Sequence, residues 1–321
     1  MRAVDLHVHT TFSDGTLTPS EIVDLAMSKG LAAVAITDHD SVAGIDEALA
    51  RRDFLVKADI DSNVNLGKGT EEDNFGVFSC GSGSGAIPEI VPGIELSTEY
   101  EGKDVHIVGL FIDHRSKEFN EYLTEFVESR INRNKKICSL LTKAGYPFSY
   151  EELMERFSGS SPAGKDIVVT RAHYARLLME KGYVKSIPEA FDRFIGDHAP
   201  FFVPREKITP EKAISLILSA GGIPILAHPV LYHMSKDRLN TLVSCLKEAG
   251  LLGIEALYST YNRGDERNIF ALAKKYDLFI SGGSDFHGAN KANIDLGTGM
   301  GRLFVPSEYY ERMKEYHSAQ V

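Results

Sequence analysis

Cysteine is scarce in this chain of 321 residues, which contains only Cys80, Cys138 and Cys245. The three cysteines lie far apart, include no C-x-x-C pair and cannot all pair with one another. This spacing excludes a disulfide framework and favours a reducing compartment. The chain also lacks any apolar run near the roughly 20 residues that a membrane helix needs.

An apolar signal segment is missing from the N-terminus, because histidines and an acidic residue interrupt the first strand-like stretch. We therefore expect a cytoplasmic protein with no membrane partner. Excess positive charge is missing too, since the net charge is −10 and the isoelectric point is about 5.6. This charge disfavours long duplex nucleic acid, but small phosphorylated nucleotides and short oligonucleotides remain possible partners. Nothing in the sequence predicts an oligomeric state.

Hydrophobic residues make up 43% of the chain, which is enough for the core of one large α/β domain with an insertion. Strand-like and helix-like segments alternate in the first and last thirds. We therefore expect an α/β body formed by residues 1–114 and 209–321, with a helical insert domain at 115–208. The Gly- and Ser-rich stretch at 57–88 is expected to be a long loop.

Histidines and acidic residues gather where the predicted strands end. The segment DLHVHTTFSDG carries the first three of them. Parallel β/α folds place their active sites at the carboxyl ends of the strands. Carboxylates packed there without a cation would repel one another, whereas imidazole and carboxylate suit divalent Mn, Zn or Fe. The nine candidate ligands are His7, His9, Asp14, His39, Glu95, His106, His228, Asp285 and His287.

Each candidate has a simpler interpretation when it is taken alone. One His-x-His pair is expected about 0.4 times by chance at this histidine content. Taken alone, His228 before a proline is better interpreted as a buried imidazole, and Glu95 could pair with an arginine. Glu255 keeps the alternative of a strand-end carboxylate in a hydrogen-bond network. The joint pattern favours two or three metal ions, because nine ligands exceed what one ion uses.

Six motifs follow one another along the chain: DLHVHTTFSDG, ITDHD, VPGIELS, HIVGLFID, ILAHP and SGGSDFHG. In this order they resemble the PHP (polymerase and histidinol phosphatase) superfamily. The resemblance is strongest to its stand-alone phosphoesterases with a helical insert, the branch of nucleoside 3′,5′-bisphosphate phosphatases and 5′–3′ exoribonucleases. It implies a distorted (β/α)7 TIM-like barrel with an inserted α-helical cap domain and a trinuclear site, often manganese. The chain departs from the family at 57–88, where a short connection is expected.

The resemblance also implies roles for single residues. It assigns one ion to His7, His9, Glu95 and Asp285, a second to Asp14, His39 and His287, and a third to Glu95, His106 and His228. The expected catalytic residues among them are Asp14, His39, Asp285 and His287. The expected substrate-binding residues are Arg130, Arg133, His173 and Asp40. The two arginines are three positions apart and so share a helix face, where a solvated basic surface is the alternative.

The implied activity is hydrolysis of phosphate monoesters of nucleotides, or of 5′ ends of short oligoribonucleotides, by a metal-bound hydroxide. A histidinol-phosphate-type phosphatase is one alternative. A metal-dependent amidohydrolase-like hydrolase is another, because barrel hydrolases share His-x-His ligands. A degenerate metal-binding module without activity is the third, and the complete ligand set argues against it.

Overall fold

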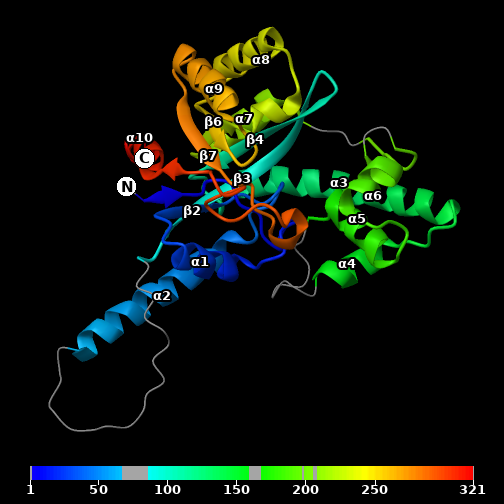
Figure 1. Ribbon diagram of the computed structural model, residues 1–321, viewed down its shortest axis with the longest axis horizontal. Helices are drawn as coiled ribbons and strands as arrows, with labels where there is room; N and C mark the ends of the chain where they lie inside the picture. Colours follow the sequence, from blue (N-terminus) through cyan, green and yellow to red (C-terminus); the bar gives the residue numbers. More distant parts are fainter. Residues whose placement is uncertain (1, 67–85, 159–167, 197–198, 205–207, 321) are drawn as a thin grey trace.

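The computed structural model describes residues 2–66, 86–158, 168–196, 199–204 and 208–320 (Figure 1). Within these residues the structure is a mixed α/β fold built around one curled six-stranded sheet with the strand order β2-β3-β4-β5-β6-β7. A separate short pair joins β1 (Ala3–Val4) to β8 (Val305–Pro306). The strands of the sheet are β2 (Ala33–Ile36), β3 (Glu89–Tyr100), β4 (Lys103–Leu110), β5 (Ile223–Leu226), β6 (Gly253–Tyr258) and β7 (Phe279–Gly283).

Strand direction changes only at β4. β2 and β3 are parallel, as are β5, β6 and β7, whereas β4 is antiparallel to both of its neighbours. The hairpin between β3 and β4 turns at Glu101 and Gly102, which both have positive φ, as the favoured two-residue hairpin turn requires. β4 runs in the opposite direction to its two neighbours. At the edge of the sheet where those neighbours end, β4 therefore contributes residues from its first half.

The start of the chain lies between the two outer strands of the sheet. The N–H of Asp5 donates to the carbonyl of Ala33 at 3.1 Å, and the N–H of His9 donates to the carbonyl of Phe286 at 3.0 Å. The segment from Asp5 to His9 therefore contacts both β2 and the residues that follow β7. It brings its two histidines to the edge where these strands end.

Helices cover the sheet and extend to one side of it (Figure 1). In α7, for example, Ala213, Ile214 and Ile217 are fully buried, so one apolar stripe of the helix faces the core. The helices are α1 (Pro19–Ser28), α2 (Ile45–Leu66), α3 (Lys117–Lys143), α4 (Tyr150–Ser158), α5 (Arg171–Glu180), α6 (Ile187–Ala190), α7 (Pro210–Ser219), α8 (Lys236–Glu248), α9 (Arg263–Lys275) and α10 (Ser307–Ser318). Short 3-10 turns are η2 (Pro229–Tyr232) and η3 (Gly288–Lys291), and η1 (Phe191–Ile195) is a π-helix.

The expectation of a loop from residue 57 onward was wrong for its first part, because α2 continues to Leu66. The sequence contains no glycine or proline between Gly44 and Gly67, so nothing in this stretch interrupts a helix. Residues 67–85 of the expected loop lie outside the described residues. In Figure 1 the far end of α2 projects away from the sheet.

The helical segment from α3 to η1 contains a core of its own. Ile137 and Leu141 at the end of α3 pack with residues of α4, α5 and η1, while Phe119 and Leu123 near its start belong to the core of the body. α3 therefore connects the two cores.

Among the described residues, no helix combines the length and apolar character needed to cross a membrane. Cys138 is a buried free thiol and Cys245 an exposed one. Cys80 lies outside the described residues.

Candidate metal centre

All nine predicted ligand residues lie together at the edge where the strands of the sheet end. Their side chains form four overlapping groups, and within each group the donor atoms lie within 4.8 Å of one another. Seven of the nine residues are buried, and the two that are partly exposed are His39 and His106. The groups are His9, Asp14, His39 and His287; His7, His9 and Asp285; His7, Glu95 and His228; and His39, Glu95 and His106. We refer to these nine residues as the nine-residue cluster.

Glu95 on β3 occupies the centre of the cluster. Its Oε1 lies 2.7 Å from Nδ1 of His106 and 3.0 Å from Nε2 of His228. Its Oε2 lies 2.9 Å from Nδ1 of His39 and 3.2 Å from Nε2 of His9. One carboxylate therefore faces ligand groups on two sides, which is the geometry that a bridging ligand needs.

Asp14 and Asp285 hold the other side of the cluster. Oδ1 of Asp14 lies 3.1 Å from Nε2 of His287, and Oδ1 of Asp285 lies 3.3 Å from Nε2 of His9. The rings of His9 and His287 are stacked, with centroids 4.1 Å apart. His9 thus connects both carboxylates, and it belongs to two of the four groups.

The cluster has a strong preference for positive charge. Burial disfavours ionisation of Glu95, but the charges of His39 and His106 outweigh it, and the pKa of Glu95 lies well below its usual range. Burial also disfavours charge on His9, yet its hydrogen bonds with Asp285 and Glu95 raise its pKa to about 9. The two carboxylates therefore hold a proton on His9 at neutral pH, at a position that a divalent cation could take instead.

The donor set fits divalent cations. Imidazole nitrogens and carboxylate oxygens are the borderline-to-hard ligands that Mn, Zn and Fe accept. Oδ1 of Asp14, which faces the histidines of the cluster, is buried and makes no hydrogen bond of suitable geometry within the described part of the chain. A buried polar atom without a partner is costly in a site that holds only protein, so it supports a ligand at this place.

Glu255 on β6 orients two histidines of the cluster. Its Oε1 lies 2.9 Å from Nδ1 of His7, and its Oε2 accepts the backbone N–H of His228 at 2.7 Å. The first contact leaves Nε2 of His7 facing the other ligands, as carboxylate–histidine pairs do in metal sites. Glu255 therefore corresponds to the alternative interpretation drawn from the sequence, in which it is a strand-end carboxylate in a hydrogen-bond network.

Asp38 is a supporting residue that the sequence analysis did not single out. It accepts the backbone N–H of Thr10 at 2.7 Å and the hydroxyls of Thr10 and Ser13 at 2.6 and 2.5 Å. These bonds fix the loop that leads to Asp14. Burial raises the pKa of Asp38 above its usual value, and the hydrogen bonds only partly offset this. Its place next to His39 in the ITDHD motif was the available indication.

Lys291 on η3 was also missed. Its Nζ lies 2.6 Å from Oδ2 of Asp285, and the hydroxyl of Tyr258 donates to the same oxygen at 2.6 Å. Burial opposes the charge of Lys291, but Asp285 outweighs this and raises the pKa of the ammonium group. Two donors therefore hold Oδ2 of Asp285, which leaves Oδ1 to face the cluster.

Backbone strain is concentrated around the cluster. Asp40, His228 and Asp285 have φ angles of 51°, 26° and 55°, in the left-handed region that non-glycine residues rarely adopt. Such conformations cost on the order of 1–3 kcal/mol each and persist where the surrounding structure enforces them. Here they aim side chains from strand ends into one small volume.

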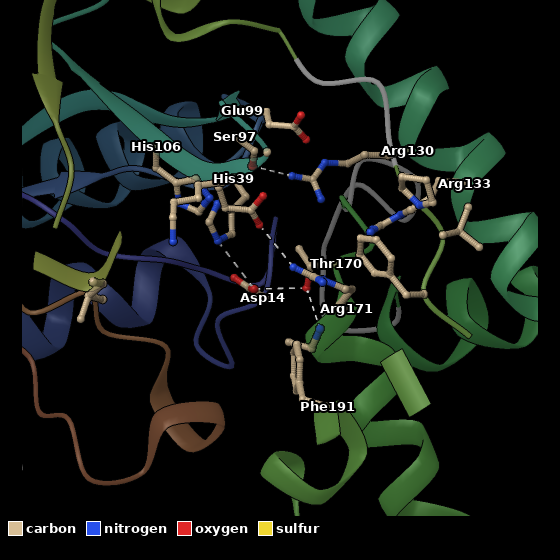
Figure 2. A pocket seen from close by; sticks show the side chains of 18 of the residues that line it. Asp14, His39, Ser97, Glu99, His106, Arg130, Arg133, Thr170, Arg171 and Phe191 are labelled. Carbon is tan, nitrogen blue, oxygen red and sulfur yellow. Dashed lines mark hydrogen bonds and ion pairs between the residues drawn. The ribbon is translucent and has the colours of Figure 1, made fainter. Parts of the chain in front are cut away.

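A cavity of about 620 Å³ opens from the cluster toward the helical segment (Figure 2). The body and the helical segment each supply one wall of it. The ionisable residues that face each other across it include Asp14, His39 and His106 from the body and Arg130, Arg133 and Arg171 from the helical segment.

Arg130 and Asp40, both predicted to bind substrate, are paired with each other. Nε of Arg130 donates to Oδ2 of Asp40 at 2.8 Å, and its terminal nitrogen NH2 contacts the same oxygen and the hydroxyl of Ser97. Oδ1 of Asp40 accepts the backbone N–H of Ser97 at 2.9 Å. Asp40 therefore positions the Arg130 guanidinium at the wall of the cavity.

The other two predicted substrate residues lie in different surroundings. Arg133 is buried and lines the cavity. His173 is buried, is not among the cavity's described lining residues, and accepts the backbone N–H of Thr170 through Nδ1 at 3.0 Å. Burial lowers the pKa of His173 to about 4, so its ring is neutral at pH 7. The hydroxyl of Thr170 in turn donates to Oδ2 of Asp14 at 3.1 Å, and this contact links α5 to the cluster (Figure 2).

Comparison with known proteins identifies the family of the chain. The PHP domain model matches residues 5–71. A 5′-3′ exoribonuclease of Haemophilus influenzae is 34% identical over 284 residues, which cover 88% of this chain and 89% of the relative. The chain belongs to the PHP family.

Two further matches come from Chromobacterium violaceum. Its 3′,5′-nucleoside bisphosphate phosphatase is 28% identical over 297 residues, covering 92% of this chain and 91% of the relative. A solved structure from the same organism, described as an amidohydrolase with bound sulfate and no metal, has a TM-score of 0.76 at 26% identity. That match covers 98% of this chain and 96% of the other. The chain is thus a phosphoesterase of the PHP type, and hence a hydrolase.

Proposed function

We propose that this phosphoesterase hydrolyses phosphate monoesters of nucleotide-type substrates, either nucleoside 3′,5′-bisphosphates or the 5′ ends of short oligoribonucleotides. The single observation that carries the proposal is the cavity. It has Asp14, His39 and His106 of the nine-residue cluster at one wall and three arginines at the other, namely Arg130, Arg133 and Arg171. The two groups of relatives are named for substrates of these two kinds.

The nine-residue cluster would hold two or three divalent cations, with manganese the first choice and zinc or iron the alternatives. When bound, such cations supply a nucleophile at neutral pH by lowering the pKa of a coordinated water. Glu95 would join the ion sites. Four members of the cluster surround the reacting phosphate in this proposal and act as catalytic residues: Asp14, His39, Asp285 and His287.

Arg130, Arg133 and Arg171 form what we call the arginine wall. This wall would bind the oxygens of the reacting phosphate and the second phosphate of the substrate. A guanidinium group binds phosphate through paired charge-assisted hydrogen bonds, and it keeps its charge at every physiological pH. Arg133 on α3 is the principal candidate. Arg130 would contribute from the position in which Asp40 holds it, at the same wall of the cavity.

We further infer that the body is the distorted seven-stranded barrel of the family. The segment from Asp5 to His9 would serve as the seventh strand, since it bonds to β2 and to the residues after β7. Residues 1–114 and 209–321 would form this barrel and residues 115–208 the cap. The separate core of the helical segment supports that division.

One assay series tests the proposed function. Metals bound to the purified protein are measured, and phosphate release is followed with nucleoside 3′,5′-bisphosphates, 5′-phosphorylated di- and trinucleotides, histidinol phosphate and a panel of amides. We expect bound divalent metal and preferential turnover of the nucleotides. Faster turnover of histidinol phosphate, or of an amide with no phosphoester hydrolysed, would overturn the proposal.

A further inference from the structure

One wall of the cavity carries aromatic rings that neither metal binding nor phosphate binding uses. Phe191 and Phe202 line the cavity beside Arg171, and both rings are half-buried. Phe191 and Arg171 lie next to each other across the cavity from His39 and His106 (Figure 2). The cavity thus combines a cationic, metal-binding end with an aromatic surface.

Arg171 holds the two rings in place. Its guanidinium carbon lies 5.9 Å from the ring centre of Phe191 and 5.7 Å from that of Phe202, within the range of cation–π attraction. A terminal nitrogen of Arg171 also lies 3.4 Å from Oδ2 of Asp104 on β4. β4 carries His106 as well, so this contact fixes the rings relative to the nine-residue cluster.

The local backbone also favours the cavity-facing position of Phe191. This residue begins η1, and its carbonyl accepts the N–H of Gly196 at 2.8 Å, a bond that spans five residues as in a π-helix. A Cβ atom at Gly196 would lie 2.5 Å from that carbonyl oxygen, so only glycine fits there. The wider turn buries Phe194 and Ile195 in the helical core, while Phe191 is partly buried against that core and also lines the cavity. π-helical turns are rare and frequent at functional sites.

We propose that Phe191 and Phe202 form a stacking platform for the nucleobase of the nucleotide whose phosphate lies at the nine-residue cluster. This inference rests on the proposed function and specifies its substrate further. Stacking on an aromatic ring is tolerant of sequence, because every base has a π-face. The platform therefore accepts all four bases.

Kinetics of Phe191→Leu test the platform, because leucine keeps apolar volume at this position and removes the aromatic face. We expect kcat/KM to fall about tenfold for the 3′,5′-bisphosphates of adenosine, guanosine, cytidine and uridine alike. The matched abasic sugar 3′,5′-bisphosphate should show no such loss. Phe304→Leu is the control, since Phe304 is 48% exposed and is not among the described lining residues.

Phe191→Trp gives an independent measurement, because the chain contains no tryptophan and the new indole is its sole strong fluorophore. The emission of this variant should fall during turnover at a saturating concentration of adenosine 3′,5′-bisphosphate. Emission should stay constant with the abasic analogue. The platform is refuted by equal losses on both substrates in Phe191→Leu, or by unchanged emission in Phe191→Trp under saturating turnover. A wild-type protein that hydrolyses no bisphosphate would instead overturn the proposed function, and the platform with it.

Discussion

The two walls of the cavity are built on different principles. The body wall consists of imidazoles and carboxylates at strand ends, held by residues such as Glu255 and Asp38 through hydrogen bonds to other residues of the body. In the helical wall, Arg130 and Arg171 pair with Asp40 and Asp104, which belong to the body. The helical wall is therefore attached to the body by the same charged groups that line the cavity.

Because of this difference, we assign the reaction to the body wall and the recognition of the substrate to the helical wall. A buried cluster of imidazoles and carboxylates has few uses other than metal binding, so few other residue types can take the place of its members. Arginine and phenylalanine serve equally well in packing, in ion pairs and in ligand binding. We therefore expect substitutions in the body wall to abolish the reaction, and substitutions in the helical wall to change which substrates are used.

The largest effect is expected for Glu95→Gln. The amide keeps the shape of the side chain but loses the charge that faces imidazoles on both sides, so metal content and kcat should fall together. The loss in kcat should be on the order of 1,000-fold, measured by phosphate release. Glu311→Gln on the exposed face of α10 is the matched control. Full activity in Glu95→Gln would contradict the central place of Glu95.

Glu255→Gln should have a smaller effect on the same wall. Glu255 accepts from both His7 and the backbone of His228, whereas an amide has one oxygen and must turn its NH2 toward one of these donors. Metal affinity and activity should fall about 10- to 100-fold, as for other residues that orient metal ligands. Titration of the metal-free protein with Mn²⁺ or Zn²⁺ measures this. If activity fell while metal affinity stayed the same, Glu255 would act directly on the substrate instead.

The residues of the body wall could be predicted from the sequence because they belong to few residue types and lie at strand ends. An ordered series of motifs was enough to name the members of the nine-residue cluster, and their assignment to individual ions stays a prediction. The change of direction at β4 also had a local signal, because only Glu101 and Gly102 separate β3 from β4 and so short a connection requires an antiparallel hairpin. Its consequence is that His106 reaches the edge from the first half of its strand.

The helical wall could be predicted only in part. Arg130 and Arg133 share a helix face by spacing alone, but the pairing of Arg130 with Asp40 joins residues 90 positions apart. His173 has a capping role at the start of α5 that an isolated TRAH motif does not reveal. Phe191 and Phe202 look like core residues in the sequence. Lys291 follows Asp285 in the sequence, and the η3 turn brings their two side chains into contact.

Arg133→Ala should show an effect of about tenfold confined to one class of substrate. Charge-assisted hydrogen bonds contribute about 1.5–3 kcal/mol, so kcat/KM for doubly phosphorylated nucleotides should fall about tenfold or more. A simple aryl phosphate should be hardly affected. Lys136→Ala, at an exposed position on the same helix, is the control.

Arg133 is the better test of the arginine wall than Arg130. Removal of Arg130 would break a buried ion pair with Asp40, and such a loss costs about 3–5 kcal/mol of stability. Arg133→Lys should recover part of the affinity by restoring charge without the paired hydrogen bonds. Equal losses on aryl phosphates and bisphosphates would remove the argument that Arg133 binds a second phosphate.

The smallest effect is expected for His173→Gln and appears as a change in pH dependence. Burial lowers the folded-state pKa of His173 to about 4 from the usual 6.5. Above pH 6.5 neither folded nor unfolded chain holds the proton. As the pH falls from 6.5 toward 4, only the unfolded chain binds it, so this residue lowers the free energy of unfolding, by about 1 kcal/mol at pH 5.5.

Glutamine at position 173 can still accept the N–H of Thr170 but does not titrate. Denaturant unfolding at pH 7.0 and 5.5 should therefore show a loss of stability that is about 1 kcal/mol smaller in the variant. The lost ring contact with Phe157 lowers the stability of the variant at both pH values and cancels in this comparison. Identical losses in both proteins would mean that His173 is protonated in the folded state. In that case it would carry charge next to Thr170 and Asp14 and could take part in phosphate binding after all.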